Sequence, residues 1–173
     1  MIKEHQTAIV TGASRGVGVY IAKALAKEGM NVVLAARNLA GLDNVATEIK
    51  AFGTKIITAP TDISDFNALK HLVSMAETEF GTIDVLVNNA ALDSPISFHK
   101  ERPEVIEQMI ATNLTAPILL SRLVLPGMLE RRRGHIVNIA SLVAKIPFPY
   151  DVMYATSKAG LAHLRILVCR HKG

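Results

Sequence analysis

The stretch "TAIVTGASRGVG", residues 7–18, decides the fold because an apolar run leads directly into a glycine-rich turn. The run at 7–11 is rich in β-branched residues and predicts a strand buried on both faces. Gly12, Gly16 and Gly18 follow in a G-x-x-x-G-x-G pattern at the start of a predicted helix. Glycines there let the backbone approach a pyrophosphate, whose charge lies against the free N–H groups of the helix N-terminus. The spacing differs from the common G-x-G-x-x-G pattern, so an ordinary glycine-rich turn is the alternative interpretation of this stretch alone.

The alternation of strand and helix continues along the whole chain. Four more apolar runs predict strands, at 31–36, 55–60, 84–89 and 135–140. The segments between the strands carry apolar residues at the three- and four-residue spacing of helices, as at Leu69, Leu72, Val73 and Ala76. This alternation predicts right-handed crossovers and an α/β fold in which helices cover both faces of a parallel sheet. We find no linker or repeat and predict a single domain over residues 1–173.

Local signals mark the helix ends. Gly29, Gly53 and Gly81 each follow the last periodic residue of a predicted helix, where a left-handed cap is favoured. Ser64 or Asp65 can cap the third helix at its start, because either side chain can accept a hydrogen bond from a free backbone N–H group. These signals predict three helices that end before the second, third and fourth strands.

Composition excludes several classes of protein. Half of the residues are hydrophobic and 20% are charged, which is typical of a globular chain rather than a disordered one. The net charge of +4 mildly favours anionic ligands, but with only 5% aromatic residues the sequence does not indicate nucleic-acid binding. The cations of "ERRR" at 130–133 stand at a predicted helix C-terminus, where the helix dipole stabilises them, and we prefer this interpretation to an anion site.

The sequence also indicates a compartment. Cys169 is the one cysteine, so no internal disulfide can form and a reducing environment is favoured. The start of the chain lacks the pattern of a signal peptide, and the most apolar stretch, 114–129, is interrupted by Arg122 and two prolines. We therefore predict a cytoplasmic protein that does not bind a membrane. The histidines and the cysteine lack the spacing of metal ligands, so we predict no metal site.

The end of the second predicted strand indicates the cofactor. In NAD-binding sheets an acidic residue about 20 positions after the glycine turn binds the ribose 2′-OH, whereas a basic residue suits a 2′-phosphate. Ala36 and Arg37 occupy this position, and Arg15 in the glycine turn adds a second positive charge. Because arginine can bind a phosphate with two hydrogen bonds, NADP(H) is favoured, with NAD(H) as the alternative. On its own, Arg37 could also begin a solvated loop.

The segment "YATSK", residues 154–158, carries the predicted chemistry. A phenol has a pKa of about 10 and is a poor acid or base at neutral pH. Lys158 lies one helical turn after Tyr154, and a nearby ammonium lowers the pKa of a phenol toward the working range. The Y-x-x-x-K spacing also occurs by chance on amphipathic helices, so the pair needs supporting residues.

Three further features support the Tyr154–Lys158 pair: Ser141, Asn113 and the "NNAA" segment at 88–91. Ser141 follows the fifth predicted strand, at the carboxyl edge of the sheet where open α/β sheets bind ligands. Its hydroxyl could hydrogen-bond a substrate carbonyl whose oxygen exchanges a proton with Tyr154. Asn113 stands in the middle of a predicted helix, where an amide is unfavourable unless it has a partner. The "NNAA" segment ends the fourth strand at the same edge.

Together these motifs resemble those of the short-chain dehydrogenase/reductase family. The matching motifs are "TGASRGVG", "TDIS" with Asp62, "NNA" at 88–90, Asn113 in "TNL", Ser141, and "YATSK". Ser141 precedes Tyr154 by 13 residues, which is the usual separation in that family. The resemblance covers about residues 7–162 and implies a Rossmann-type, doubly wound domain that uses NAD(P) to interconvert an alcohol and a carbonyl.

The resemblance also implies a role for each matching residue. Tyr154 is then the general acid/base, Lys158 lowers its pKa and holds the nicotinamide ribose, and Ser141 positions the substrate oxygen. Asn113 supports a proton relay through water to Lys158. The implied cofactor-binding residues are Gly12, Ser14, Arg15, Gly16, Val17, Gly18, Arg37, Asp62, Ile63, Asn89, Ala90, Tyr154 and Lys158, with Asp62 near the adenine and Asn89 near its ribose.

The end of the chain departs from the family pattern. Family members usually continue through two further strands, a helix and a loop that shapes the substrate pocket. We therefore expect a chain truncated relative to the family, with strand order 3-2-1-4-5, an unpaired edge at 135–140 and an uncovered apolar helix face. In the family, the helices that correspond to 104–132 and 153–172 pack against a partner subunit, which implies a homodimer or a homotetramer.

Two functional hypotheses follow. The first is an NADP-preferring oxidoreductase that acts on a small alcohol or carbonyl substrate. The second is a catalytically inactive fragment that binds a dinucleotide or pairs with a full-length relative. Intact Ser141, Tyr154 and Lys158 favour the first hypothesis, and the short C-terminal part favours the second.

Overall fold

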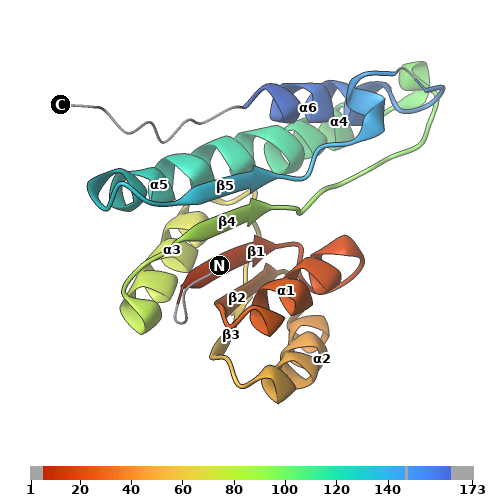
Figure 1. The fold of residues 1–173 in the computed structure, drawn as a ribbon. Helices are drawn as coiled ribbons and strands as arrows, with labels where there is room; N and C mark the ends of the chain where they lie inside the picture. The colour runs from red at the N-terminus through yellow and green to blue at the C-terminus, as the bar shows by residue number, and fades with distance from the viewer. Residues whose placement is uncertain (1–5, 147, 165–173) are drawn as a thin grey trace.

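The five predicted strands form one parallel sheet in the order β3-β2-β1-β4-β5 (Figure 1). The computed structural model describes residues 6–146 and 148–164. The strands are β1 (Thr7–Thr11), β2 (Asn31–Ala36), β3 (Ile56–Pro60), β4 (Val85–Asn88) and β5 (His135–Asn138). The α/β class and the strand order are confirmed. The predicted strands at 55–60, 84–89 and 135–140 are each one or two residues too long at their ends.

Six α-helices connect and cover the strands. They are α1 (Val17–Lys27), α2 (Leu39–Ile49), α3 (Phe66–Phe80), α4 (Pro103–Ile110), α5 (Ala116–Glu130) and α6 (Val152–His163). A π-helical segment, Ala111–Thr115, joins α4 to α5. Short 3₁₀ turns occupy Lys50–Phe52, Phe98–Lys100 and Leu142–Ala144.

Two predicted helices need correction at their ends. The segment predicted at 104–132 begins at Pro103 and ends at Glu130, because Arg132 has a left-handed φ of 50° that no α-helix accommodates. The segment predicted at 153–172 begins at Val152, and its helix ends at His163. Residues 165–173, including Cys169, lie outside the described residues.

The predicted caps are confirmed. Gly29, Gly53 and Gly81 have φ values of 84°, 76° and 77°, a region that favours glycine. Of the two candidate caps for α3, Asp65 is the one used, since its carboxylate accepts a hydrogen bond from the Asn67 N–H at 2.8 Å.

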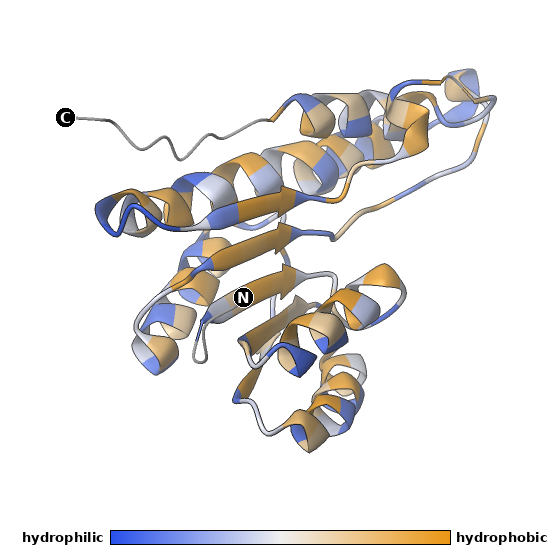
Figure 2. Cartoon of the chain, viewed as in Figure 1, coloured by the Kyte–Doolittle hydropathy of each residue, from blue (hydrophilic) through white to orange (hydrophobic). Residues whose placement is uncertain are grey.

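Alternating side chains of the strands build two apolar layers. One layer packs against α1 and α2, and the other packs against α3 and α5 (Figure 1). Figure 2 shows the strands as a continuous apolar band between the helices. On the α1/α2 side of the sheet, β5 is less well covered than β4. Val87 of β4 is 2% exposed, whereas Val137, its register partner in β5, is 42% exposed. Within the described residues β5 pairs only with β4, so the expected unpaired edge is present but only four residues long.

The helical segment Pro103–Glu130 is long and apolar enough to cross a bilayer by length and composition alone. In the structure, 39% of its most apolar window is buried. Ala116, Leu120, Val124 and Met128 of this segment belong to the layer that packs on the sheet. Packing in the core therefore accounts for much of its apolar character.

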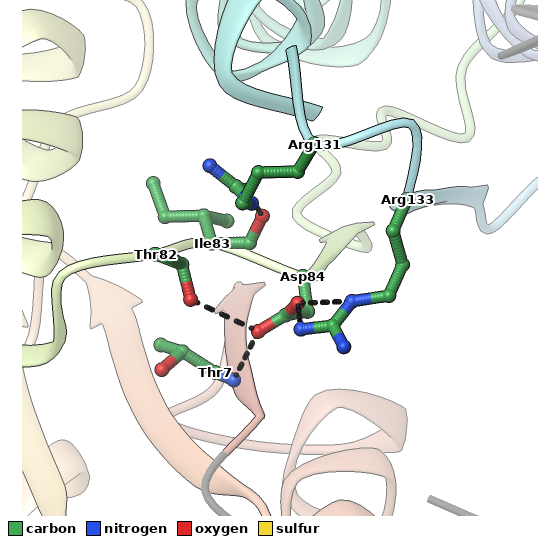
Figure 3. Close-up of polar contacts among 6 residues, drawn as sticks. All are labelled: Thr7, Thr82, Ile83, Asp84, Arg131 and Arg133. Carbon is green, nitrogen blue, oxygen red and sulfur yellow. Dashed lines mark hydrogen bonds and ion pairs between the residues drawn. The ribbon is translucent and has the colours of Figure 1, made fainter. Parts of the chain in front are cut away.

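A buried carboxylate ties three strands together at the amino edge of the sheet (Figure 3). Asp84, directly before β4, is 1% exposed. Its Oδ2 accepts hydrogen bonds from the Thr7 N–H at 3.0 Å and from the Thr82 hydroxyl at 3.3 Å. Its Oδ1 accepts two from Arg133, at 3.1 Å from Nε and 2.6 Å from Nη2. Since Arg133 lies two residues before β5, one carboxylate links the starts of β1, β4 and β5.

Two arginines of the 130–133 segment thus form hydrogen bonds to the segment before β4, which the sequence did not indicate. Besides the contact of Arg133, Arg131 donates a hydrogen bond from Nη2 to the Ile83 carbonyl at 2.9 Å (Figure 3). The sequence placed these cations at the C-terminus of a helix, and α5 does end there, with Arg131 as its C-cap; the hydrogen bonds of Arg131 and Arg133 to Ile83 and Asp84 were not predicted. Their partners lie almost 50 positions earlier in the chain, which local sequence patterns do not reveal.

We expect Asp84→Ala to lower the free energy of unfolding by roughly 2–3 kcal/mol, because it leaves the buried Thr7 N–H without an acceptor. The loss is smaller than for a fully buried ion pair, since the Arg133 side chain is about half exposed. Urea denaturation of both proteins measures the difference. Asp43→Ala, at an exposed position of α2, should stay within about 0.5 kcal/mol of the parent chain. An Asp84→Ala protein as stable as the Asp43→Ala protein would contradict this account.

Candidate active site

The carboxyl edge of the sheet carries a cleft of about 860 Å³. Most of the predicted site residues line it: Gly12, Ser14, Arg15, Gly16, Val17, Arg37, Asp62, Ile63, Asn89, Ala90, Tyr154 and Lys158. Gly18, Asn113 and Ser141 are not among the lining residues. The sequence analysis did not identify several others that line the cleft, namely Ala36, Asn38, Thr61, Ala91, Leu92, Gln108, Thr112, Ile139 and Ala140.

The glycine turn between β1 and α1 packs too closely for side chains. A Cβ at Gly12, whose φ is 67°, would lie 2.8 Å from the Ala90 Cα, and one at Gly18 would lie 2.4 Å from the Gly12 carbonyl oxygen. Gly16, the N-cap of α1, has no side chain to bond the free N–H groups of the first helical turn. The turn therefore presents unscreened backbone N–H groups to the cleft, as binding of a pyrophosphate requires.

Thr11 and Asn89 hold this turn against the end of β4. The Thr11 hydroxyl accepts hydrogen bonds from the N–H groups of Asn89 and Ala90 at 3.0 and 3.1 Å, and donates to the Val87 carbonyl at 3.2 Å. The Asn89 amide donates to the carbonyls of Thr11 and Gly12 at 2.9 and 3.3 Å. Asn89 therefore braces the turn as well as lining the cleft. Thr11 was not identified from the sequence, although its place directly before the first glycine could have indicated it.

Two exposed arginines stand at the end of the cleft beside β2. Arg15 lies in the glycine turn and Arg37 directly after β2, as the sequence predicted. Asp62, after β3, lines the same region, and its carboxylate accepts hydrogen bonds from the hydroxyl and N–H of Ser64 at 2.7 and 3.0 Å. These hydrogen bonds lower the pKa of Asp62 and outweigh its partial burial, and the charge of Arg37 lowers it further. Asp62 is therefore ionised at neutral pH.

Tyr154, on the first turn of α6, is half-buried at the opposite end of the cleft. Burial raises its pKa, and the carboxylates of Asp93 and Asp151 raise it further, whereas a hydrogen bond with Ser141 lowers it. Ser141 and Tyr154 are thus brought together as the sequence predicted. In the protein alone, the phenol is protonated at neutral pH.

The expectation that Lys158 lowers the pKa of Tyr154 is not met in this structure. The Lys158 Nζ lies 5.7 Å from the centroid of the Tyr154 ring, on the same face of α6. It donates a hydrogen bond at 2.7 Å to the Ile139 carbonyl rather than to the phenol. Burial of Tyr154 and the charge of Asp93 determine the direction of the shift instead. Helical spacing places the two side chains on one face of α6, but it does not determine which acceptor the ammonium binds.

Lys158 is nevertheless an unusual cation. Its side chain is one of the largest that are fully buried, with 1% of the residue exposed, and burial lowers its pKa. Its ammonium has three protons, and it lines the cleft. An oxygen-rich ligand in the cleft could therefore accept hydrogen bonds from it.

Asn113 lies at the centre of the π-helical segment and is fully buried. Its Oδ1 accepts a hydrogen bond from the Leu92 N–H at 2.7 Å, and its Nδ2 donates to the Leu92 carbonyl at 2.7 Å and to the Ser157 hydroxyl at 3.0 Å. Both amide protons are thus committed to the protein, so the side chain cannot donate one to a relay water. Pro117 lacks the N–H that would bond the Asn113 carbonyl in an α-helix, which gives the local widening into a π segment a physical cause.

The arrangement as a whole fits a dinucleotide. The side-chain-free glycine turn, the free N–H groups of α1 and the two arginines suit phosphate groups, while the buried ammonium beside Tyr154 suits ribose hydroxyls. A volume of about 860 Å³ also lies within the usual range of sites for small molecules and cofactors.

Comparisons with known proteins agree with this geometry. A model of the family described as short chain dehydrogenase matches residues 6–169. The ketoacyl reductase HetN of Nostoc sp. is 45% identical over 156 residues, which are 90% of this chain and 54% of that protein. The gluconate 5-dehydrogenase of Gluconobacter oxydans is 35% identical, over 91% of this chain and 61% of its own length. The chain thus spans little more than half the length of these curated relatives.

The fold is also found among solved structures. The crystal structure of a metagenomic short-chain oxidoreductase in complex with NADP superposes with a TM-score of 0.89 at 40% sequence identity. The match covers 92% of this chain and 72% of that chain.

Proposed function

The chain belongs to the short-chain dehydrogenase family, and on this premise we propose that it is an NADP-preferring oxidoreductase that interconverts an alcohol with a ketone or aldehyde. The observation that carries the proposal is one cleft that combines a side-chain-free glycine turn and two arginines with Tyr154 and a buried Lys158. A structural neighbour with 40% sequence identity was solved in complex with NADP, which supports the choice of cofactor.

In the proposed reaction, Tyr154 exchanges a proton with the substrate oxygen. The nicotinamide, when bound, supplies the hydride donor or acceptor for the substrate carbon. During reduction the phenol donates its proton to the carbonyl oxygen, and during oxidation the phenolate accepts the proton of the alcohol. Ser141, whose side chain lies close enough to Tyr154 to lower the pKa of the phenol, would stabilise the same oxygen. A phenol with its ordinary pKa of about 10 is protonated at neutral pH, so Tyr154 is in the form that donates a proton during carbonyl reduction.

The residues that would hold the cofactor divide between the two ends of the cleft. The glycine turn and the N-terminus of α1 would bind the pyrophosphate, and Arg15 and Arg37 the 2′-phosphate. Lys158 would hold the nicotinamide ribose, and the Asp62–Ile63 segment would contact the adenine. Asn113, whose amide is committed to Leu92 and Ser157, would contribute to a proton relay only through its backbone.

We expect Arg37→Asp to reverse the cofactor preference. Loss of charge-assisted hydrogen bonds to the 2′-phosphate should weaken NADPH binding about 10- to 100-fold, and NADH binding should change much less. Calorimetric titration with both dinucleotides measures the ratio of their affinities. Arg122→Asp, at an exposed position of α5, makes the same charge change away from the cleft and should leave the ratio unaltered. An unchanged ratio in Arg37→Asp would defeat this assignment.

The activity itself is tested by NADPH oxidation. The purified 173-residue chain is incubated with NADPH and a panel of ketones and aldehydes, and absorbance of the reduced nicotinamide is followed. Turnover that requires both NADPH and a carbonyl compound supports the proposal. A folded chain that binds NADPH but reduces no carbonyl compound would support the second candidate, an inactive fragment that binds dinucleotide or pairs with a full-length relative. That candidate is favoured by the exposed Val137 on the α1/α2 side of β5.

The proposal includes self-association as a homodimer or homotetramer through α4–α5 and α6. Ile118 and Leu129 on α5 and Val152 on α6 are each more than 40% exposed, so an apolar surface is available for such contacts. Sedimentation equilibrium measures the mass of the assembly. The cytoplasmic location stays a prediction.

A further inference from the structure

Ser157 lies between Tyr154 and Lys158 on α6 and makes two buried hydrogen bonds. Its hydroxyl accepts a hydrogen bond from the Asn113 Nδ2 at 3.0 Å and donates one to the Tyr154 carbonyl at 2.8 Å. The residue is fully buried. The neighbouring Thr156 also donates to a carbonyl of α6, that of Val152 at 2.8 Å, but its side chain is exposed and bonds within the helix.

These hydrogen bonds connect the two sides of the cleft. Asn113 holds both the N–H and the carbonyl of Leu92 at 2.7 Å, and Ser157 joins the same amide to the backbone of Tyr154. Leu92 and Tyr154 both line the cleft. A single buried amide therefore sets the distance between the loop after β4 and the first turn of α6.

Polar contacts take a large part in the placement of α6. The buried residues of this helix are Ser157, Lys158 and Leu161, so two of the three are polar. Lys158 is bonded to the Ile139 carbonyl, and the Leu164 carbonyl just past the helix accepts a hydrogen bond from Asn138 at 2.9 Å. Directional hydrogen bonds thus help to fix the rotation of α6 and its position along its own axis.

We propose that Ser157 is a positioning residue for the reaction: through Asn113 it holds α6 so that the Tyr154 hydroxyl meets Ser141 and Lys158 faces the cleft. This inference rests on the proposed function, in which Tyr154 carries the proton. Removing the Ser157 hydroxyl leaves one amide proton of Asn113 without an acceptor and removes the hydrogen bond to the Tyr154 carbonyl. A displacement of the helix by a fraction of an ångström separates Tyr154 from Ser141, and misplacements of about 1 Å can cost roughly 100-fold in rate.

The test compares Ser157→Ala with the matched control Thr156→Ala, since each removes one hydroxyl from neighbouring positions of α6. The first readout is the ionisation of Tyr154, followed by NMR titration of the chain labelled with ring-¹³C tyrosine. The chain has three tyrosines, so a Tyr154→Phe sample assigns the signal. This readout needs neither cofactor nor substrate. The second readout is kcat and KM for the carbonyl compound that the parent chain reduces fastest, together with the Kd for NADPH.

We expect Ser157→Ala to move the titration of Tyr154 and to lower kcat about 10- to 100-fold, while KM and the NADPH Kd change less than about threefold. Thr156→Ala should match the parent chain in every measurement. A merely structural role would lower the melting temperature and leave the titration of the folded protein unmoved. A folded Ser157→Ala chain with an unmoved titration would overturn the inference, as would an equal shift in Thr156→Ala.

The inference can still be tested if the variant does not fold or if the parent chain shows no turnover. If Ser157→Ala does not fold, Ser157→Cys decides, because its thiol has nearly the same volume and is only a weak donor: a moved titration supports the inference and an unmoved one overturns it. If the parent chain shows no turnover, the proposed function fails, whereas the titration of Tyr154 still decides whether Ser157 positions it.

Discussion

Replacing Tyr154 with phenylalanine should lower NADPH-dependent carbonyl reduction about 10²- to 10⁴-fold, the usual contribution of a general acid. The change removes one oxygen from a half-buried ring and leaves the ring in place. Once the phenol is absent, we expect water to replace it as the proton donor. Initial rates of NADPH oxidation at saturating carbonyl compound measure the loss.

The binding of NADPH separates a catalytic role from damage to the fold. Tyr154→Phe should keep the NADPH Kd within about threefold of the parent value, because the residues that we propose bind the phosphates lie at the other end of the cleft. Tyr20→Phe, which removes the same oxygen from an exposed ring on α1, should alter neither rate nor Kd. If Tyr154→Phe retained more than a tenth of the parent rate, another group would have to supply the proton.

Gly18→Ala should abolish dinucleotide binding, the second large effect that we expect. The added Cβ would lie 2.4 Å from the Gly12 carbonyl oxygen and 2.6 Å from the Asn89 Nδ2. The Gly12 carbonyl belongs to the turn and the Asn89 amide is hydrogen-bonded to it, so the backbone of the turn must move. We expect at least a 100-fold loss of NADPH affinity and a loss of roughly 1–3 kcal/mol in the free energy of unfolding from overpacking. Calorimetric titration and urea denaturation measure the two effects.

Gly53→Ala provides a control that is destabilised for a different reason. Gly53 has a φ of 76° and open space around a Cβ, so alanine there costs about 1 kcal/mol of backbone strain without touching the cleft. This variant should bind NADPH like the parent chain. If Gly18→Ala bound NADPH as tightly as Gly53→Ala does, the glycine turn would not be the phosphate-binding element.

Local patterns were sufficient to predict the sheet. The β-branched runs and the glycines at positions 29, 53 and 81 correspond to real strands and helix ends, because both signals reflect backbone preferences of the residues themselves. The family resemblance supplied the strand order and brought Ser141, Tyr154 and Lys158 into one neighbourhood. The structure confirms this order, and Ser141 lies close enough to Tyr154 to lower the pKa of the phenol.

What the sequence did not reveal depends on contacts between distant segments. Asp84 and Arg133 meet 49 positions apart, and Asn113 and Ser157 meet 44 positions apart. The direction of the pKa shift of Tyr154 was wrongly predicted for the same reason. Helical spacing places Lys158 near the phenol, but its ammonium is bonded to the Ile139 carbonyl, and burial and the charge of Asp93, 61 positions earlier, raise the pKa of Tyr154. Such effects follow from three-dimensional surroundings rather than from the motif.

The most direct test is calorimetric titration of the purified 173-residue chain with NADPH and with NADH. The account predicts saturable binding of one NADPH per chain, with NADH at least about tenfold weaker because it lacks the 2′-phosphate that Arg15 and Arg37 are proposed to bind. A chain that melts cooperatively but binds neither dinucleotide at millimolar concentration would contradict the account.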